Sequence, residues 1–298
     1  MKNKILLVGG TGYIGSVLNN YLKDKYQIYR TSLSKSNEKK EFIIDLKVSE
    51  SFNSLINYKF DIVFFLASSI KGIGKKNLNN IDLEINTICL ANFIDFLKKN
   101  KLTKKIVYMS SMTVYAPSKI IPVNELFDLS PTSIYGLSKK IAEEIIKFNS
   151  LNSNIKSLVL RIPGVYGGNR KNGLLYKVIK NALHNNSINI NTENLEYWEC
   201  IELNDLCFLL KKLLGVYKWN SKYEEINIGY GEKIDLIDTV QLIHNKVNSK
   251  AKLYFKNKSY SDFYLDVKKL KDIIDYDLSF KNGLFSYIKQ IKNEIRDR

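Results

Sequence analysis

Tyrosine and lysine spaced four residues apart form the first pattern in this sequence that could carry chemistry. Tyr135 and Lys139 stand at i and i+4 and so project from the same face of a helix. A lysine ammonium there stabilises tyrosinate, and we expect it to lower the Tyr135 pKa from about 10 toward neutrality. Only two histidines are present, so proton transfer is expected to use Tyr, Lys, Ser or a carboxylate. The spacing alone identifies no site, because it recurs at Tyr21, Tyr115, Tyr176, Tyr254 and Tyr264.

The sequence before Tyr135 distinguishes this copy of the pattern from the others. Residues 106–111 are an apolar run that ends in the hydroxyls of Ser110 and Ser111, which predicts a buried strand with polar residues at its end. Tyr135 opens the next long helical pattern, 24 residues after Ser111. Apolar residues recur there at spacings of three and four, which predicts one apolar helix face.

A glycine triplet near the start of the chain predicts a dinucleotide site. Gly9, Gly12 and Gly15 follow an apolar run at 5–8 and precede a helical pattern. Glycine allows a tight turn and lets the backbone approach a pyrophosphate, whose charge then lies on the helix N-terminal amides. The chain has only 15 glycines, so three of them between an expected strand and an expected helix are not expected by chance.

The stretch that follows the second expected strand bears on which dinucleotide is bound. An acidic residue usually hydrogen-bonds the adenosine ribose there, but residues 29–35 contain no acid. The Ser32 hydroxyl with Lys35 or Arg30 could instead hold a 2′-phosphate, which favours NADP over NAD, although these could also be ordinary loop residues. Asp45, after the third expected strand, is a candidate adenine contact or an exposed strand-end carboxylate.

The elements around these residues alternate between short apolar runs and helical patterns. This alternation predicts an α/β fold, a doubly wound parallel sheet with crossover helices. The expected strands are 5–8, 27–31, 41–44, 62–66, 106–110 and 157–161, and the expected helices are 14–23, 85–100 and 133–149.

The alternation becomes irregular after about residue 168. Pro163 and glycines 164, 167 and 168 mark a boundary, so we expect a dinucleotide-binding domain at 1–167 and a smaller α/β substrate domain at 168–298. Helical patterns occupy 174–184, 205–214 and 234–247. A strand near 225–228 is expected to return to the main sheet.

Taken together, these motifs resemble the extended short-chain dehydrogenase/reductase family, in its nucleotide-sugar branch of NAD-dependent epimerases, reductases and dehydratases. The resemblance implies a Rossmann-type sheet. The motifs occur in family order over most of the chain: Gly9 to Gly15, residues 61–67, Asn86, Ser111, Tyr135 to Lys139, residues 160–167, 204–206 and 227–229.

The resemblance also implies roles for individual residues. Ser111 would hydrogen-bond the substrate oxygen, Tyr135 would exchange the proton, and Lys139 would hold the nicotinamide ribose. Hydride transfer to a carbonyl builds an alkoxide, which needs such a proton donor and a second hydrogen bond. The implied cofactor contacts are Gly9, Thr11, Gly12, Tyr13, Ile14, Gly15, Ser32, Lys35, Asp45, Leu46, Leu66, Ala67, Asn86, Tyr135, Lys139 and Pro163. The implied substrate contacts are Ser111, Met112, Thr113, Gly164 and Arg170.

Departures from the family pattern narrow the expected reaction. Family dehydratases carry an Asp-Glu pair where this chain has Met112 and Thr113, which disfavours water elimination. Epimerisation next to a ketone needs ionisable side chains near the same place, and Met112 cannot ionise. Simple hydride transfer remains.

Other departures affect substrate binding. Phe65 replaces a usual His, Gly164 a usual Asn, and residues 197–199 a usual Arg. Arg170, Lys171 and Lys177 could supply charge for a diphosphate or form a solvated basic face. Trp198 or Tyr197 could stack on a base or belong to the core.

The expected function is reduction of a nucleotide-linked 4-keto hexose, with Tyr135 as proton donor. An NAD-retaining 4-epimerase is the alternative, and a non-catalytic dinucleotide-binding regulator is a second one. We expect a homodimer through the helices at 85–100 and 133–149.

Composition argues against several other classes. The formal charge is +16, but only five of the 46 basic residues are arginine and they are not clustered, unlike a nucleic-acid site. The three cysteines lack a Cys-x-x-Cys spacing, so we expect neither a metal site nor a disulfide. Apolar runs are far shorter than the roughly 20 residues of a membrane helix, and the start lacks a secretory core, so a cytoplasmic protein is expected.

Overall fold

A computed structural model describes residues 2–34, 40–71, 80–117, 120–192, 198–256 and 262–296. The chain forms two compact units. The first comprises Met1–Ala116, Leu126–Ile162 and Leu210–Asn227, and the second comprises Pro117–Glu125, Pro163–Leu209 and Ile228–Arg298. The sequence predicted one boundary at 167/168. In the structure each unit instead combines separate stretches, because the chain enters the second unit at Pro163 and comes back to the first for residues 210–227.

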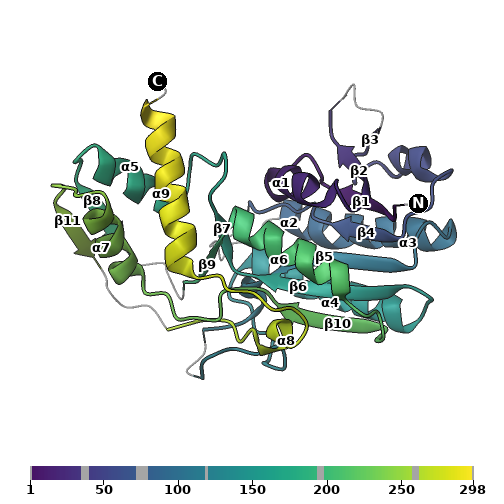
Figure 1. The fold of residues 1–298 in the computed structure, drawn as a ribbon. Coiled ribbons are helices and arrows are strands. Elements are labelled where there is room, and N and C mark those ends of the chain that lie inside the picture. The colour runs from purple at the N-terminus through teal and green to yellow at the C-terminus, as the bar shows by residue number, and fades with distance from the viewer. Residues whose placement is uncertain are drawn as a thin grey trace. The chain divides into compact units, whose positions relative to one another are not determined.

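The first unit is built on a seven-stranded sheet whose neighbouring strands are all parallel (Figure 1). The order is β3-β2-β1-β4-β5-β6-β10, so the winding direction reverses between β1 and β4. This confirms the predicted doubly wound fold. The strands are β1 (Lys4–Val8), β2 (Gln27–Ser32), β3 (Glu41–Ile43), β4 (Ile62–Phe65), β5 (Lys105–Ser111), β6 (Lys156–Ile162) and β10 (Tyr223–Asn227).

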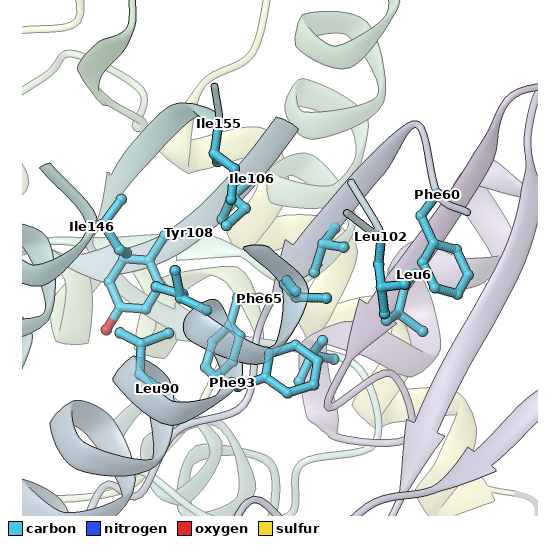
Figure 2. Close-up of a cluster of buried hydrophobic side chains, with 14 of the residues drawn as sticks. Leu6, Phe60, Phe65, Leu90, Phe93, Leu102, Ile106, Tyr108, Ile146 and Ile155 are labelled. Atoms are coloured by element: carbon cyan, nitrogen blue, oxygen red, sulfur yellow. The ribbon is translucent and has the colours of Figure 1, made fainter. Parts of the chain in front are cut away.

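The central strands are continuous apolar runs because both faces of a parallel sheet are covered. Figure 2 shows the cluster on one face, where Leu6, Phe65 and Tyr108 from alternate strand positions lie with Phe93 and Ile146. All five side chains are buried. This packing fixes the strands, and with them the residues that follow their carboxyl ends.

Helices connect the strands of the first unit. The predicted helix at 85–100 begins as a π-helical turn, Glu84–Cys89, and α4 begins where the Ser133 hydroxyl accepts the Gly136 amide at 3.1 Å. The α-helices are α1 (Tyr13–Leu22), α2 (Asn80–Leu83), α3 (Leu90–Lys99), α4 (Ile134–Leu151) and the end of α6 (Leu203–Val216), with 3₁₀ turns at Ser49–Leu55 and Met112–Val114.

The second unit contains two small parallel strand pairs and several helices. The helical patterns expected at 174–184 and 234–247 form α5 (Leu174–Leu183) and α7 (Leu236–Lys246). The other elements were not predicted: β7 (Gly164–Tyr166) with β9 (Cys200–Glu202), β8 (Ile188–Asn191) with β11 (Leu253–Lys256), α8 (Lys268–Lys271) and α9 (Phe280–Arg296).

Candidate active site

The candidate site lies in the first unit, at the carboxyl ends of β1, β4 and β5. Ligands of doubly wound sheets bind outside these ends, where the strand order reverses. The glycine loop follows β1, residues 66–69 follow β4, and Ser111 is the last residue of β5. The amides of Leu66 and Ala67 both donate to the Val8 carbonyl at 2.9 Å, which joins the first two segments.

Two glycines of the loop are required by the packing of the loop itself. Gly9 has a φ of +80°, and a Cβ there would lie 2.8 Å from the Ala67 nitrogen. A Cβ on Gly15 would lie 2.6 Å from the Gly9 carbonyl oxygen. Gly12 is different, because it is exposed and meets only the Gly9 oxygen, at 3.1 Å. Its lack of a side chain leaves the backbone open to a ligand.

The N-terminus of α1 suits an anion. Gly12 is the N-cap residue and provides no side-chain cap, and the first turn contains no acidic residue. Thr11 is exposed, whereas Tyr13 and Ile14 are half-buried. Helix N-terminal amides favour negative charge. The loop and helix start therefore fit the pyrophosphate of a dinucleotide.

The end of β2 holds fewer candidates for a 2′-phosphate than the sequence offered. Arg30 forms an ion pair with Glu41 of β3, with 2.8 Å between Nη2 and Oε2, and both side chains are largely buried. This pairing across strands was not foreseen. Ser32 is buried and accepts the Ser34 amide at 3.2 Å. Lys35 lies outside the described residues.

The predicted contacts after β3 have distinct surroundings. Asp45 is exposed, and its Oδ1 accepts the Lys47 amide at 2.9 Å, so the carboxylate helps to form the turn after the strand. Leu46, like Ala67, packs against the sheet's hydrophobic cluster.

Tyr135 lies on the first turn of α4 and is buried. The hydroxyls of Ser68 and Ser111 lie beside its phenol. Burial raises the Tyr135 pKa to about 12, while the two hydroxyls lower it in part. The sequence-based expectation of a pKa near neutrality is therefore wrong, since burial outweighs the groups that stabilise tyrosinate.

Lys139 lies one helical turn after Tyr135 and is also buried. Its Nζ donates to the Met109 carbonyl at 2.8 Å and to the Tyr108 hydroxyl at 3.2 Å, and lies 5.8 Å from the centre of the Tyr135 ring. Burial lowers the Lys139 pKa to about 7, although Glu143 and then Asp82 raise it in part. The ammonium is thus directed at the end of β5 and is close to half-protonated at neutral pH.

Ser111 is held by the short turn that follows β5. Its Oγ accepts the Thr113 amide at 3.2 Å and the Thr113 hydroxyl at 2.9 Å. Met112 and Thr113 are half-buried in this turn. A Cβ on Gly136 would lie 2.1 Å from the Thr113 carbonyl oxygen, so glycine is what allows α4 to approach the turn so closely. This requirement was not predicted.

Asn86 lies in the π-helical turn and connects two parts of the site. Its Nδ2 donates to the Ser69 carbonyl and to the Ser138 hydroxyl, both at 2.9 Å, and its Oδ1 accepts the Ser69 amide at 2.8 Å and the Ser68 hydroxyl at 3.0 Å. Single π-helical turns are frequent at functional sites. Asn86 therefore ties the segment after β4 to α4.

Three predicted contacts belong to the second unit. Pro163 is buried, Gly164 is exposed and donates its amide to the Glu199 carbonyl at 3.1 Å, and Arg170 donates to the Asn172 side chain at 2.6 Å. Lys171, considered as a diphosphate ligand, lies 3.6 Å from Glu294. Tyr197 lies outside the described residues.

Comparison with known proteins decides the family. A model of the NAD dependent epimerase/dehydratase family matches residues 5–229, which is most of the chain. The chain belongs to this family. This membership confirms the resemblance found in the sequence. The protein is therefore an NAD-dependent nucleotide-sugar enzyme.

Individual relatives span nearly the whole chain. A putative UDP-glucose 4-epimerase of Methanocaldococcus jannaschii is 25% identical and covers 98% of this chain and 99% of its own. A dTDP-4-dehydro-6-deoxyglucose reductase of Escherichia coli is 27% identical and covers 90% of each. The crystal structure of a UDP-glucose 4-epimerase from Thermotoga maritima, 21% identical, covers 98% of this chain and 99% of its own with a TM-score of 0.83, which supports the fold.

The described residues contain neither a metal-binding cluster nor a membrane-spanning helix. Among the described residues, no three His, Cys, Asp or Glu side chains are grouped so that they could hold a metal ion. No helix in that part of the chain is long and apolar enough to cross a membrane.

Sequence reasoning missed several side chains of the site. Ser68, Tyr108 and Ser138 all contact a predicted residue, namely Tyr135, Lys139 and Asn86 respectively. For Ser68 a signal was present, because a polar residue that directly follows a buried parallel strand lies at the ligand-binding edge of the sheet. Tyr108 and Ser138 carried no such signal, since each lies inside an otherwise ordinary strand or helix.

Proposed function

We propose that the protein reduces a nucleotide-linked 4-keto hexose, with Tyr135 as proton donor and NADPH as the preferred hydride source. The observation that carries the proposal is the Tyr135 hydroxyl, which meets the Ser111 hydroxyl at the carboxyl edge of the sheet, one helical turn from Lys139. A bound reduced nicotinamide dinucleotide supplies hydride, and this chain's residues manage the proton.

Ser111, Tyr135 and Lys139 each have a separate role in the proposed reaction. Ser111 donates a hydrogen bond to the substrate carbonyl oxygen, which becomes an alkoxide in the reaction. Tyr135 then gives its proton to that oxygen, and its raised pKa keeps the proton on the phenol until the alkoxide forms. Lys139, charged below about pH 7, holds the nicotinamide ribose.

The turn after β5 supports hydride transfer over water elimination. Met112 has no ionisable group, and the Thr113 hydroxyl is engaged with Ser111. Neither residue offers the acid and base that elimination needs. Reduction requires only the hydroxyls that the site contains.

The relatives favour a second candidate, a 4-epimerase that retains NAD. One of the whole-length relatives is named as a putative UDP-glucose 4-epimerase. Such an enzyme removes hydride from the sugar and returns it to the opposite face, so the same Tyr135 serves as base and then as acid. Cofactor retention distinguishes the two candidates.

We therefore propose a two-step experiment. Purified protein is denatured and the released nucleotide identified, and the folded protein is then screened for NADPH oxidation with a panel of nucleotide-4-keto-sugars. A reductase turns over with added NADPH, whereas stoichiometric bound NAD with sugar interconversion indicates the epimerase. Dinucleotide binding with neither NADPH oxidation nor sugar interconversion would favour the regulator.

Tyr135→Phe tests the proton donor. It removes one hydroxyl and should lower turnover by about 10² or more while the fold and cofactor affinity are kept. Tyr176→Phe is the matched control, since Tyr176 has the same spacing to a lysine but lies in α5. Wild-type turnover in Tyr135→Phe, with chemistry rate-limiting, would exclude this residue.

The NADP preference rests on the missing ribose acid and on Ser32 with Lys35. Calorimetric titration should show NADPH binding more tightly than NADH. Tighter NADH binding by tenfold, about 1.4 kcal/mol, would reverse this assignment.

The role of the glycine loop is tested by Gly12→Glu. This change places a side chain and a negative charge at the pyrophosphate position and should abolish binding of both NADPH and NADH.

We also propose that two copies of the chain pair through α3 and α4. An apolar stripe on the outside of α4 includes Ile141, Phe148 and Leu151, and the last two are 68% and 58% exposed. Ile88, just before α3, is 60% exposed. Apolar stripes of this kind mark protein interfaces. Light scattering should give a dimer mass, and Phe148→Glu should shift it to the monomer.

A further inference from the structure

A cavity of about 730 Å³ lies in the first unit, at the opposite edge of the sheet from the candidate active site. Lys2 precedes β1, Lys25 precedes β2, and Lys105 opens β5. Because the strands are parallel, their first residues share one edge and the candidate active site occupies the other. The five residues of β1 separate the two edges by roughly 15 Å. The cavity is therefore a separate place on the molecule.

Three lysines line this cavity and no acidic residue does. Lys2 and Lys25 are exposed and Lys105 is half-buried. In the part of the chain that the structure describes, none of the three forms an ion pair. The carboxylate of Asp61, which directly precedes β4, accepts the Lys4 amide at 2.7 Å. The lining thus carries positive charge only.

The end of α6 brings one of these ammonium groups to the cavity. A Cβ at Gly215 would lie 2.9 Å from Lys25 Nζ, so glycine leaves the space that the ammonium needs. The Tyr26 hydroxyl donates to the Leu214 carbonyl at 3.2 Å, which joins the start of β2 to α6. Tyr26, Leu214 and Ile62 are buried and line the same cavity. Lys25 therefore lies at the edge of an apolar surface.

Trp219 provides an aromatic surface in the same cavity. Its ring is half-buried, and Lys105 Nζ lies 5.4 Å from the ring centre. The Tyr217 ring packs edge-on against it, with 5.1 Å between centres. Lys156 donates to the Trp219 carbonyl, and the Tyr217 hydroxyl donates to Glu224, so both aromatic residues are held in place. The cavity thus combines a fixed indole with an adjacent ammonium group.

We propose that this cavity binds a nucleotide, with the phosphates on the three lysines and the base against Trp219. Lysine binds phosphate as a point charge, and every base has a face that stacks on an aromatic ring. The volume falls within the range of ligand pockets, roughly 300–1,000 Å³. A ligand that joins phosphates to a planar ring uses both the charge and the indole, whereas phosphate alone uses only the charge.

Trp219 fluorescence tests the proposal at the cavity itself. The chain has two tryptophans, so Trp198→Phe leaves Trp219 as the single reporter. ADP is the probe, and adenosine and inorganic pyrophosphate are tested by their ability to displace it. ADP should change the emission saturably and bind about tenfold more tightly than either fragment, since only ADP engages both the lysines and the ring. Added salt should weaken ADP binding.

Lys105→Gln tests the charge, and Lys104→Gln is its matched control. Lys104 is the preceding residue, is exposed and does not line the cavity. We expect Lys105→Gln to weaken ADP binding about tenfold and Lys104→Gln to change it by less than about twofold. Thermal unfolding checks that both variants are folded.

Three results would overturn the nucleotide site: no saturable change in Trp219 emission, equal losses in Lys105→Gln and Lys104→Gln, or pyrophosphate that binds as tightly as ADP. The test is independent of the proposed function. Lys105 and Trp219 lie away from the carboxyl ends of the strands, so the measurement decides the site whether or not Tyr135→Phe lowers turnover.

Discussion

Both units of the protein bury glutamate side chains, and Glu143 of the first unit has different partners from Glu199 of the second. In the first unit, Glu143 of α4 accepts Arg161 Nη2 at 2.7 Å, Arg161 Nε at 3.2 Å and the Ser110 hydroxyl. In the second unit, Glu199 Oε2 accepts the Leu265 amide at 3.0 Å, while Oε1 has no hydrogen-bond partner among the described residues. Burial raises the Glu199 pKa to about 8. Glu143 is thus paired with a cation, whereas Glu199, which has none beside it, takes up a proton more readily.

The paired glutamate lies next to the strand that carries Ser111. In the sheet Arg161 of β6 lies between Ser110 of β5 and Asn227 of β10. Its Nη1 donates to the Tyr115 hydroxyl at 2.8 Å, which donates in turn to Asn227 at 2.8 Å. Although burial opposes it, the charge and hydrogen bonds of Glu143 raise the Arg161 pKa overall. The network joins β5, β6, β10 and α4 next to Ser111.

Removing one member of the pair should have the largest effect on stability. Arg161→Met strands the Glu143 carboxylate in the core, and we expect a loss of about 3–5 kcal/mol in the free energy of unfolding. The double variant Glu143→Leu/Arg161→Met leaves no stranded charge and should lose less. Urea denaturation measures both. If the double variant were destabilised as much as Arg161→Met, the pair would stabilise the fold through packing rather than through charge neutralisation.

The unpaired glutamate should make stability depend on pH. The folded pKa of about 8 exceeds the ordinary value of 4.5, so between these pH values the folded state holds a proton that the unfolded state has lost. The Glu199 contribution to stability therefore falls as pH rises through this window, by up to about 1.4 kcal/mol per pH unit. Glu199→Gln cannot ionise and should flatten this slope, as followed by urea midpoints across the window.

Glu202 adds to the pH dependence of stability in the lower part of that window but not at its upper end. Burial raises the Glu202 pKa to about 7, so its contribution has the same sign and is complete near that pH. Between pH 7 and 8 Lys139, whose pKa burial lowers to about 7, contributes a slope of the opposite sign, because the folded state has lost a proton that the unfolded state keeps. The Glu199 contribution is therefore the difference in slope between the wild type and Glu199→Gln. An unchanged slope in Glu199→Gln within this interval would show that the Glu199 carboxyl is not buried in the protonated form.

The same contrast between the units explains what the sequence could predict. The central strands of the first unit are apolar runs bounded by glycine or polar residues, so β1, β4 and β5 were predicted to within two residues of their ends. In the second unit β8 alternates buried and exposed residues over only four positions, and β9 has three. Such short segments carry little periodicity, because their neighbours rather than their own residues decide their conformation.

Contacts between elements were harder to predict from the sequence than the elements themselves. The Arg30–Glu41 pair depends on the register of β2 and β3, which no local pattern gives. The Tyr135 pKa was misjudged because it is set by the burial of the phenol, which depends on how α4 packs against other elements. By contrast α9 was overlooked although its buried residues Phe280, Leu284 and Tyr287 have helical spacing. Its signal was present in the sequence.

The smallest expected effects concern the N-caps of α4 in the first unit and α7 in the second. The first cap is a neutral side chain and the second is a charged one. The α4 cap is the neutral Ser133 hydroxyl with one amide bond, whereas Asp235 Oδ1 accepts the Ile237 and Asp238 amides at 2.7 and 2.9 Å at the start of α7. Ser133→Ala should cost about 1 kcal/mol. Asp235→Ala should cost more, about 1–2 kcal/mol, because it also removes a negative charge from the positive end of the helix dipole. Asp235→Asn keeps the acceptor but not the charge, so it should lose only the difference between the two caps. Thermal unfolding of the three variants at low and high salt separates the terms, since salt screens only the charge. Equal losses for Ser133→Ala and Asp235→Ala at low salt would mean that the carboxylate acts at this helix as an acceptor alone.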